Sequence, residues 1–173
     1  MASVSCIIIY TLLLVSSSSS SLESEREREA LVRTGWWGNQ IPFDAPNKQQ
    51  HCSWSGIGCS EEGRVVSIIC EYSIVDELGK LNFSSFPYLE TLDLSYCGLN
   101  GSIPYQIGML SKLNYLSFRG NYLTGELPFS FGNLTQLKTL DLSSNYLTIG
   151  NELEKLNFSS FPYLETLGLS YCT

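Results

Sequence analysis

The chain has 173 residues, an apolar fraction of 43% and a formal net charge of −7. This length suits one modest domain, and the apolar fraction excludes wholesale disorder. The 17 acidic residues outnumber the 10 basic ones, and no Lys/Arg cluster lines up to meet a phosphate backbone, which argues against nucleic acid as a partner.

Residues 1–21 predict a secretory signal peptide. An apolar run from Cys6 to Val15 precedes six serines, Ser16 to Ser21. The run falls well short of the roughly 20 residues that span a bilayer. A positively charged start is missing, so the alternative is a buried amino-terminal helix followed by a serine linker. We expect no membrane span in this chain, and a location that is secreted or on the extracellular face of the plasma membrane.

Residues 22–64 predict a polar cap. The charged run from Glu23 to Arg33 indicates a short helix that ends before Gly35. The Trp-Trp pair at 36–37 and the segment Cys-Ser-Trp-Ser-Gly-Ile-Gly-Cys at 52–59 follow. We expect the tryptophans to form the cap core. A disulfide between Cys52 and Cys59 would close a small loop and contribute roughly 2 to 3 kcal/mol.

Five cysteines follow the leader, so pairing in an exporting compartment leaves at least one free. Cys97 and Cys172 favour a structural role at a turn over a role as disulfide partners or reactive thiols. The pairing of Cys70, Cys97 and Cys172 stays open. Four Asn-x-Ser/Thr acceptors agree with export and are candidate glycosylation sites: Asn82, Asn100, Asn133 and Asn157.

Residues 65–173 repeat with a period of 24, as about four to five units of which the last is incomplete. Leu89, Leu92, Leu94 and Leu99 recur 24 residues later as Leu113, Leu116, Phe118 and Leu123, and again as Leu137, Leu140, Leu142 and Leu147. Apolar residues on either side of one polar residue predict a short strand with one buried face. The Cys or Asn that follows, at 97, 121, 145 and 172, is expected to bond backbone groups at the turn.

Each strand is followed by a return segment with a glycine turn and a proline, at 101–104 and 125–128. Two repeats lack the proline, and we expect their return sides to be less regular. Residues 78–97 and 153–172 agree at 18 of 20 positions. That agreement exceeds what shared packing requires and indicates a copying event, and with the end at Thr173 we expect a truncated product.

The outward strand residues are the candidate ligand-binding surface. Tyr96, Tyr115 and Arg119 are the strongest candidates because aromatic residues and Arg dominate binding hot spots. Ser95, Ser117, Asp141 and Ser143 complete the set. Solvated surface is the alternative for each of them.

Catalytic chemistry finds no support in the sequence. His51 is the single histidine, and its spacing to Cys52 and Cys59 matches no usual zinc pattern. The sequence offers neither a second histidine nor a recognisable Ser/His/Asp constellation, so hydrolytic chemistry by a triad has no residues to use. We expect no catalytic residue, no metal site and no cofactor.

Cap and repeats together resemble plant leucine-rich-repeat proteins. The resemblance rests on two motifs. One is C-x-W-x-G-I-x-C at 52–59, and the other is L-x-x-L-x-L-x-x-N-x-L-x-G-x-I-P, seen best at 89–110 and 113–134. The double Trp after Glu-Ala-Leu looks most like the ectodomains of plant receptor-like kinases and receptor-like proteins. The resemblance implies an α/β solenoid. In it a right-handed superhelix has short parallel strands on its concave side, an irregular or 3-10 convex side, and a helical amino-terminal cap.

The resemblance also implies recognition of a peptide, a cell-wall fragment, another protein or a co-receptor ectodomain. It does not imply kinase activity, because the chain lacks the glycine-rich loop and catalytic aspartate of a kinase. Two alternatives remain at this stage. The chain could be a secreted inhibitor of a cell-wall-degrading enzyme, which would need a full set of repeats and a carboxy-terminal cysteine cap, or a non-functional remnant.

Overall fold

The computed structural model describes residues 21–37, 50–71, 74, 76–148, 160–170 and 172. The signal peptide predicted over 1–21 lies outside these residues except for Ser21, and the acceptor Asn157 lies outside them entirely. Among the described residues, no helix combines the length and the apolar character that crossing a membrane requires.

The amino-terminal helix covers residues 21–34 and is followed by short strands and 3-10 helices. In chain order these are η1 (Gln50–Ser53), β1 (Ile57–Cys59), β2 (Val65–Ile69), η2 (Leu78–Lys80), η3 (Phe83–Ser85), β3 (Thr91–Asp93), β4 (Asn100–Gly101), η4 (Tyr105–Met109), β5 (Tyr115–Ser117), β6 (Tyr122–Glu126), η5 (Phe129–Asn133), β7 (Thr139–Asp141), β8 (Tyr146–Thr148) and β9 (Thr166–Gly168). The helix ends before Gly35, whose φ of 72° suits glycine.

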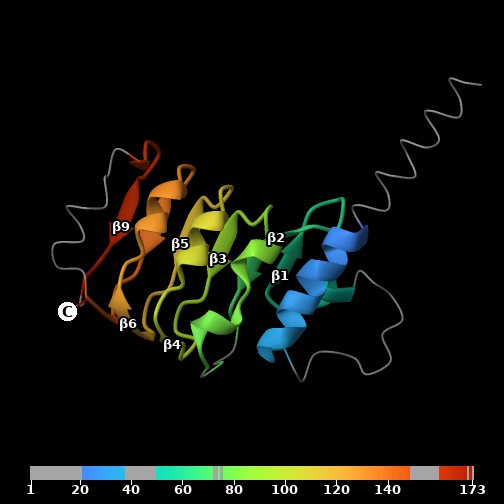
Figure 1. Ribbon diagram of the computed structural model, residues 1–173, viewed down its shortest axis with the longest axis horizontal. Helices are drawn as coiled ribbons and strands as arrows, with labels where there is room; N and C mark the ends of the chain where they lie inside the picture. The colour runs from blue at the N-terminus through green and yellow to red at the C-terminus, as the bar shows by residue number, and fades with distance from the viewer. Residues whose placement is uncertain are drawn as a thin grey trace, which may run out of the picture.

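Six strands form one sheet in the order β1-β2-β3-β5-β7-β9. Strand β1 is antiparallel to β2, and the remaining neighbours are parallel. The register aligns equivalent residues, so Leu92 faces Leu116 and Leu116 faces Leu140. The sequence period has therefore become a stack of coils, with the cap at one end and β9 at the other (Figure 1).

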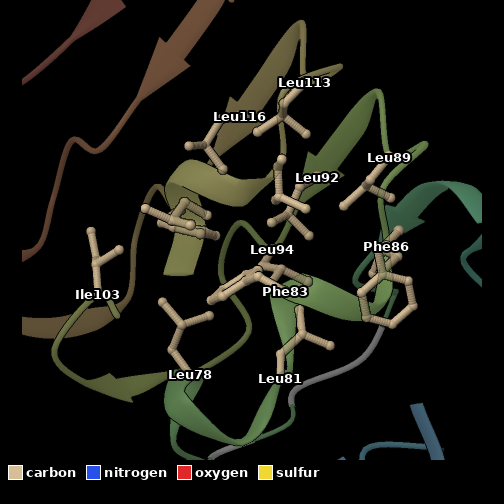
Figure 2. Packing of buried hydrophobic residues seen from close by; sticks show 14 of the residues in the cluster. Leu78, Leu81, Phe83, Phe86, Leu89, Leu92, Leu94, Ile103, Leu113 and Leu116 are labelled. Atoms are coloured by element: carbon tan, nitrogen blue, oxygen red, sulfur yellow. The ribbon is translucent and has the colours of Figure 1, made fainter. Parts of the chain in front are cut away.

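Leucines from every described coil fill one continuous core. Leu92, Leu94 and Leu116 are fully buried, and Figure 2 shows them packing with Phe83 and Phe86. Each buried side chain of this size contributes roughly 2 kcal/mol. One coil alone cannot offset its ordering cost, so the coils are stable only as a stack. The predicted solenoid with parallel strands is confirmed.

Buried asparagines join successive turns, as the sequence analysis predicted. The Asn121 Oδ1 accepts hydrogen bonds from the N–H groups of Cys97, at 3.1 Å, and Leu99, at 2.9 Å. Its Nδ2 donates to the carbonyls of Leu94 and Phe118, at 2.7 and 2.8 Å. Asn145 makes the same kind of bonds one coil later. These contacts satisfy backbone groups that lie outside the strand pairing.

The return side is built from short 3-10 helices. Helices η4 and η5 begin directly after Pro104 and Pro128, and each buries one apolar residue, Ile107 and Phe131. A second sheet, β4-β6-β8, was missed from the sequence. The recurring Asn-Tyr-Leu-Thr at 121–124 and 145–148 was the available signal, because aromatic and β-branched residues favour strands.

The cap is tied to the first strand by a buried ion pair. One face of the amino-terminal helix is buried, and it includes Glu27, at 0% exposure. The Arg64 guanidinium donates to Glu27 Oε1 from Nε, at 3.2 Å, and from Nη2, at 3.0 Å. The Val65 N–H donates to Glu27 Oε2 at 3.2 Å. Trp37 and Trp54 are also buried, so they belong to the cap core.

Two disulfides are present among the residues that the structure describes. Cys52 and Cys59 are bonded with their Cα atoms 5.6 Å apart. Cys70 and Cys97 are bonded across 27 residues. The preference for a structural role of Cys97 over a role as disulfide partner was therefore wrong. Its N–H does bind Asn121, but Cys70, which directly follows β2, comes within bonding reach of Cys97. Cys172 is free, and its thiol donates to the Leu142 carbonyl at 3.3 Å.

Replacing Asn121 by alanine should strongly destabilise the stack. The N–H groups of Cys97 and Leu99 would lose their shared acceptor while remaining buried, which we expect to cost about 3 kcal/mol. Urea unfolding followed by circular dichroism measures this loss. Asn114→Ala, whose side chain makes no such bonds, is the control, and equal losses in both variants would contradict the role given to Asn121.

Stability should fall in mild acid because of His51. Burial lowers the pKa of His51 below 6.5. In mild acid the unfolded chain therefore binds a proton at His51 that the folded chain does not bind. This contribution is present above pH 6.5 and is lost as the pH falls towards the lower pKa of the folded state. Burial raises the pKa of the neighbouring Glu27 carboxyl, which acts in the opposite direction.

The variant His51→Phe keeps a ring in the cap core but cannot titrate. Between about pH 7.5 and pH 5.5 its free energy of unfolding should fall by about 1 kcal/mol less than that of the native chain. Urea titrations at the two pH values measure the difference. Because His51 is the single histidine, an identical pH dependence in both proteins would mean that the imidazole titrates alike folded and unfolded.

Candidate functional site

The outward residues of the six-stranded sheet form aligned rows, and we call this side the open face. One row contains Ser67, Thr91, Tyr115, Thr139 and Thr166, and the next contains Ile69, Asp93, Ser117, Asp141 and Gly168. It is the side that the sequence analysis expected to be concave. Neighbouring strands lie about 4.8 Å apart, so an extended ligand could contact several rows.

Tyr96, Arg119 and Asp141 lie together at the carboxyl ends of the strands. The Arg119 Nε donates to the Tyr96 hydroxyl at 2.8 Å, and Arg119 Nη1 lies 3.6 Å from Asp141 Oδ2. Tyr96 is 65% exposed, and the Arg119 side chain is 51% exposed. Two of the three strongest candidates are thus brought into contact across neighbouring coils, with a guanidinium held in place and open to solvent.

The backbone at the strand ends explains how Tyr96 reaches Arg119. Tyr96, Gly120 and Ser144 occupy equivalent positions and have φ values of 56°, 66° and 56°. A Cβ on Gly120 would lie 2.4 Å from two carbons of the Tyr96 ring. Gly120 therefore leaves room for the ring to pack against the next coil, beside Arg119.

Tyr115 lies in the row between Thr91 and Thr139 and is half-buried. Burial, followed by the nearby Asp93 carboxylate, raises the pKa of the Tyr115 phenol. The hydroxyl also forms side-chain hydrogen bonds with Asp93 and Ser117, which tie Tyr115 to the neighbouring row.

The serine candidates are mostly framework. Ser117 and Ser143 are 2% and 3% exposed. The Ser143 hydroxyl donates to Asp141 Oδ1 at 2.5 Å, and the Ser117 and Ser95 hydroxyls are hydrogen-bonded at 2.7 Å. Ser117 and Ser143 are buried in this arrangement and their hydroxyls bond to neighbouring side chains, which gives both residues a framework role. Asp141 serves both the turn and Arg119.

The acceptors Asn82, Asn100 and Asn133 are exposed, as glycan attachment requires. His51, Cys52 and Cys59 place potential metal-ligand atoms within 4.8 Å of one another. The two sulfurs form a disulfide and His51 is buried. A metal would need both cysteines as free thiolates, so this group does not suit a metal in the oxidised chain.

The sequence analysis also missed an aromatic pair on the second sheet. The rings of Tyr122 and Tyr146 stack with their centroids 6.3 Å apart, and both are exposed. The 24-residue spacing of the two tyrosines was the signal, but it pointed to contact only once β6 and β8 were known to pair.

Stacked coils of 24 residues around a leucine core, joined by buried asparagines, define a leucine-rich-repeat protein. The leucine-rich-repeat family profile matches residues 87–147, and a second profile of the same repeat matches residues 136–161. In sequence the chain is similar to segments of plant leucine-rich-repeat receptor-like kinases, and in fold it is similar to plant receptor ectodomains.

Individual relatives show what the chain is similar to. The leucine-rich-repeat receptor-like serine/threonine-protein kinase RGI4 of Arabidopsis thaliana is 38% identical over 90 residues, which are 50% of this chain and 8% of the kinase. The chain thus spans a small part of this relative. The structure of the BIR3–SERK2 complex from Arabidopsis thaliana has a TM-score of 0.61 at 29% identity, covering 76% of this chain and 70% of that one. A plant ice-binding protein has a TM-score of 0.66 at 28% identity, covering 84% and 47%.

Placing alanine at Gly120 should displace the Tyr96 ring. The positive φ alone costs about 1 kcal/mol, and the clash with the ring should add about 2 kcal/mol. Gly125→Ala is the control, because Gly125 has a φ of 82° and its nearest neighbour, the Ser102 Cβ, lies at 3.5 Å. Unfolding free energies of both variants measure the difference. Equal costs would mean that Tyr96 does not rest on Gly120.

Proposed function

We propose that the open face is the recognition surface of a plant receptor-type ectodomain, and that it binds an extended peptide or a segment of a partner protein. The carrying observation is the exposed Arg119 guanidinium, held by the Tyr96 hydroxyl and by Asp141. Arginine and tyrosine are the side chains that most often dominate binding energy. Fixing them in advance lowers the entropy lost on binding.

The chemistry of Arg119 indicates what the ligand carries. Its Nε is taken by Tyr96, while its terminal nitrogens retain donors for a carboxylate or a carbonyl. An acidic side chain or a chain terminus of a peptide fits this position. The row that contains Thr91, Tyr115 and Thr139 offers hydroxyl donors and acceptors beside it.

Relatives and compartment support a binding role outside the cell. One structural relative was solved as a complex of two proteins, BIR3 and SERK2. This relative is consistent with a protein partner or co-receptor for the present chain. Two disulfides suit an oxidising compartment. The fold alone does not select the ligand, since a plant ice-binding protein shares it. The arrangement at Arg119 therefore carries the proposal.

Selection of a hexapeptide library on the purified full chain, followed by calorimetry of the best binder, tests this function. Arg119→Ala should weaken that binder about tenfold or more, which corresponds to about 1.4 kcal/mol. Tyr96→Phe should weaken it less, because the ring stays and only the hydroxyl that holds Arg119 is lost. Arg33→Ala is the control, since Arg33 is an exposed arginine on the cap helix.

The proposal fails if the selected peptides bind the Arg119→Ala and native chains equally well. It also fails if no hexapeptide binds above background while the chain unfolds cooperatively. Cooperative unfolding of the native chain would separately exclude a remnant that does not fold.

A further inference from the structure

A pocket of about 510 Å³ lies where the cap meets the repeats. Its volume falls within the range of roughly 300 to 1,000 Å³ that is usual for ligand sites. The cap loop contributes Glu62, and the starts of three successive coils contribute Arg64, Val66, Tyr88, Glu90 and Lys112. None of these residues belongs to the site around Arg119.

The repeat period explains why these side chains are neighbours. Arg64, Tyr88 and Lys112 are spaced by 24 residues, as are Val66 and Glu90. The parallel register places residues with this spacing side by side at the start of β2 and just before β3 and β5. The pocket therefore forms where two such rows meet the cap loop and Glu23 of the amino-terminal helix.

The Arg64 guanidinium is already fully engaged. It bonds Glu27 through Nε and Nη2 and pairs with Glu23 through Nη1. Its central carbon lies 4.4 Å from the centroid of the Tyr88 ring. Arg64 therefore supports the ring and offers no free charge to a ligand, while Tyr88 remains 44% exposed. Val66 and Tyr88 supply an apolar surface inside a charged rim.

The rim has an excess of negative charge. Three carboxylates, those of Glu23, Glu62 and Glu90, line the pocket with two cations, Arg64 and Lys112. Neither Glu62 nor Glu90 has an ion-pair partner within the part of the chain that the structure describes. The Ser60 hydroxyl holds the pKa of Glu62 below its usual value, which keeps this carboxylate ionised. Lys112, Glu62 and Glu90 are all exposed, so water screens the repulsion by Lys112 and the attraction by the two carboxylates alike. Among these three groups the negative charges outnumber the positive one.

We propose that this pocket binds a lysine or arginine side chain of the ligand that occupies the open face. The methylene stem would lie on Val66 and Tyr88, as long cationic side chains do on apolar surface, and the charged head would reach Glu62 and Glu90. The exposed part of the Tyr88 ring adds a cation–π contact. This inference rests on the proposed function and adds a basic residue to the ligand.

The internal duplication provides a matched control. Residues 153–172 copy 78–97, so Tyr163 and Glu165 repeat Tyr88 and Glu90. Tyr163 and Glu165 are likewise exposed. The pairing of β7 with β9 sets Gln136 and Lys138 beside this copy, in the places that Arg64 and Val66 take beside the original. The copy keeps the ring and the carboxylate but lacks the supporting arginine and the cap loop.

The experiment titrates the full chain with N-acetyl-arginine methylamide and, separately, with N-acetyl-glutamate methylamide. Nuclear magnetic resonance follows the Tyr88 and Tyr163 ring signals and the Val66 methyl signals. The arginine probe should shift Tyr88 and Val66 saturably and leave Tyr163 unchanged. Glu90→Gln should weaken its binding about fivefold, which is about 1 kcal/mol, whereas Glu165→Gln should have no effect.

The inference is overturned if the glutamate probe binds as well as the arginine probe, if Tyr88 and Tyr163 shift equally, or if a folded Glu90→Gln chain binds the arginine probe unchanged. Arg119→Ala should not alter these shifts. A failed arginine-probe titration would not affect the peptide result at Arg119. A failed peptide selection would not affect the titration of the cation pocket, so the two proposals can fail separately.

Discussion

Hydrogen bonds from buried asparagines are the contacts on which the stack depends. A coil that turns sharply after a three-residue strand leaves N–H and C=O groups that no neighbouring strand can pair. The side-chain amide of Asn121 hydrogen-bonds four of these groups: it accepts from two N–H groups and donates to two carbonyls. With those groups satisfied, leucines of successive coils can close over one another without burying unpaired backbone. The alignment of every other row follows from this arrangement.

The same alignment creates the two surfaces to which we assign binding. Side chains 23 or 24 residues apart in the sequence touch: Tyr96 holds Arg119, and Arg64 lies over Tyr88. In both pairs an aromatic ring and a guanidinium come from neighbouring coils. In one pair the guanidinium is exposed and able to bind a partner. In the other pair the guanidinium of Arg64 is bound by Glu23 and Glu27. A ligand can therefore contact only the Tyr88 ring and the nearby carboxylates.

The cap does more than cover the first coil. Glu27 is fully buried, and burying a carboxylate is costly unless it is paired and hydrogen-bonded. Arg64 and the Val65 N–H supply that pairing from the start of the first repeat strand. These bonds tie the helix to the start of β2. This docking sets the wall of the cation pocket, because Glu23 and Arg64 stand on either side of the junction.

The amino-acid sequence determined the features that are local or periodic. The 24-residue spacing gave the strands and their inward leucines, the charged run before Gly35 gave the cap helix, and the Asn positions gave the turn bonds. The tertiary structure decided the burial and the contacts of side chains that come from different coils. Ser117 and Ser143 look exposed in a strand pattern, yet the packed coils bury them. Cys70 forms a disulfide with Cys97, and Glu27 pairs with Arg64 across 37 residues of sequence. Neither contact could be predicted, because the repeat period shows which face a side chain occupies but not which residue of another coil it contacts.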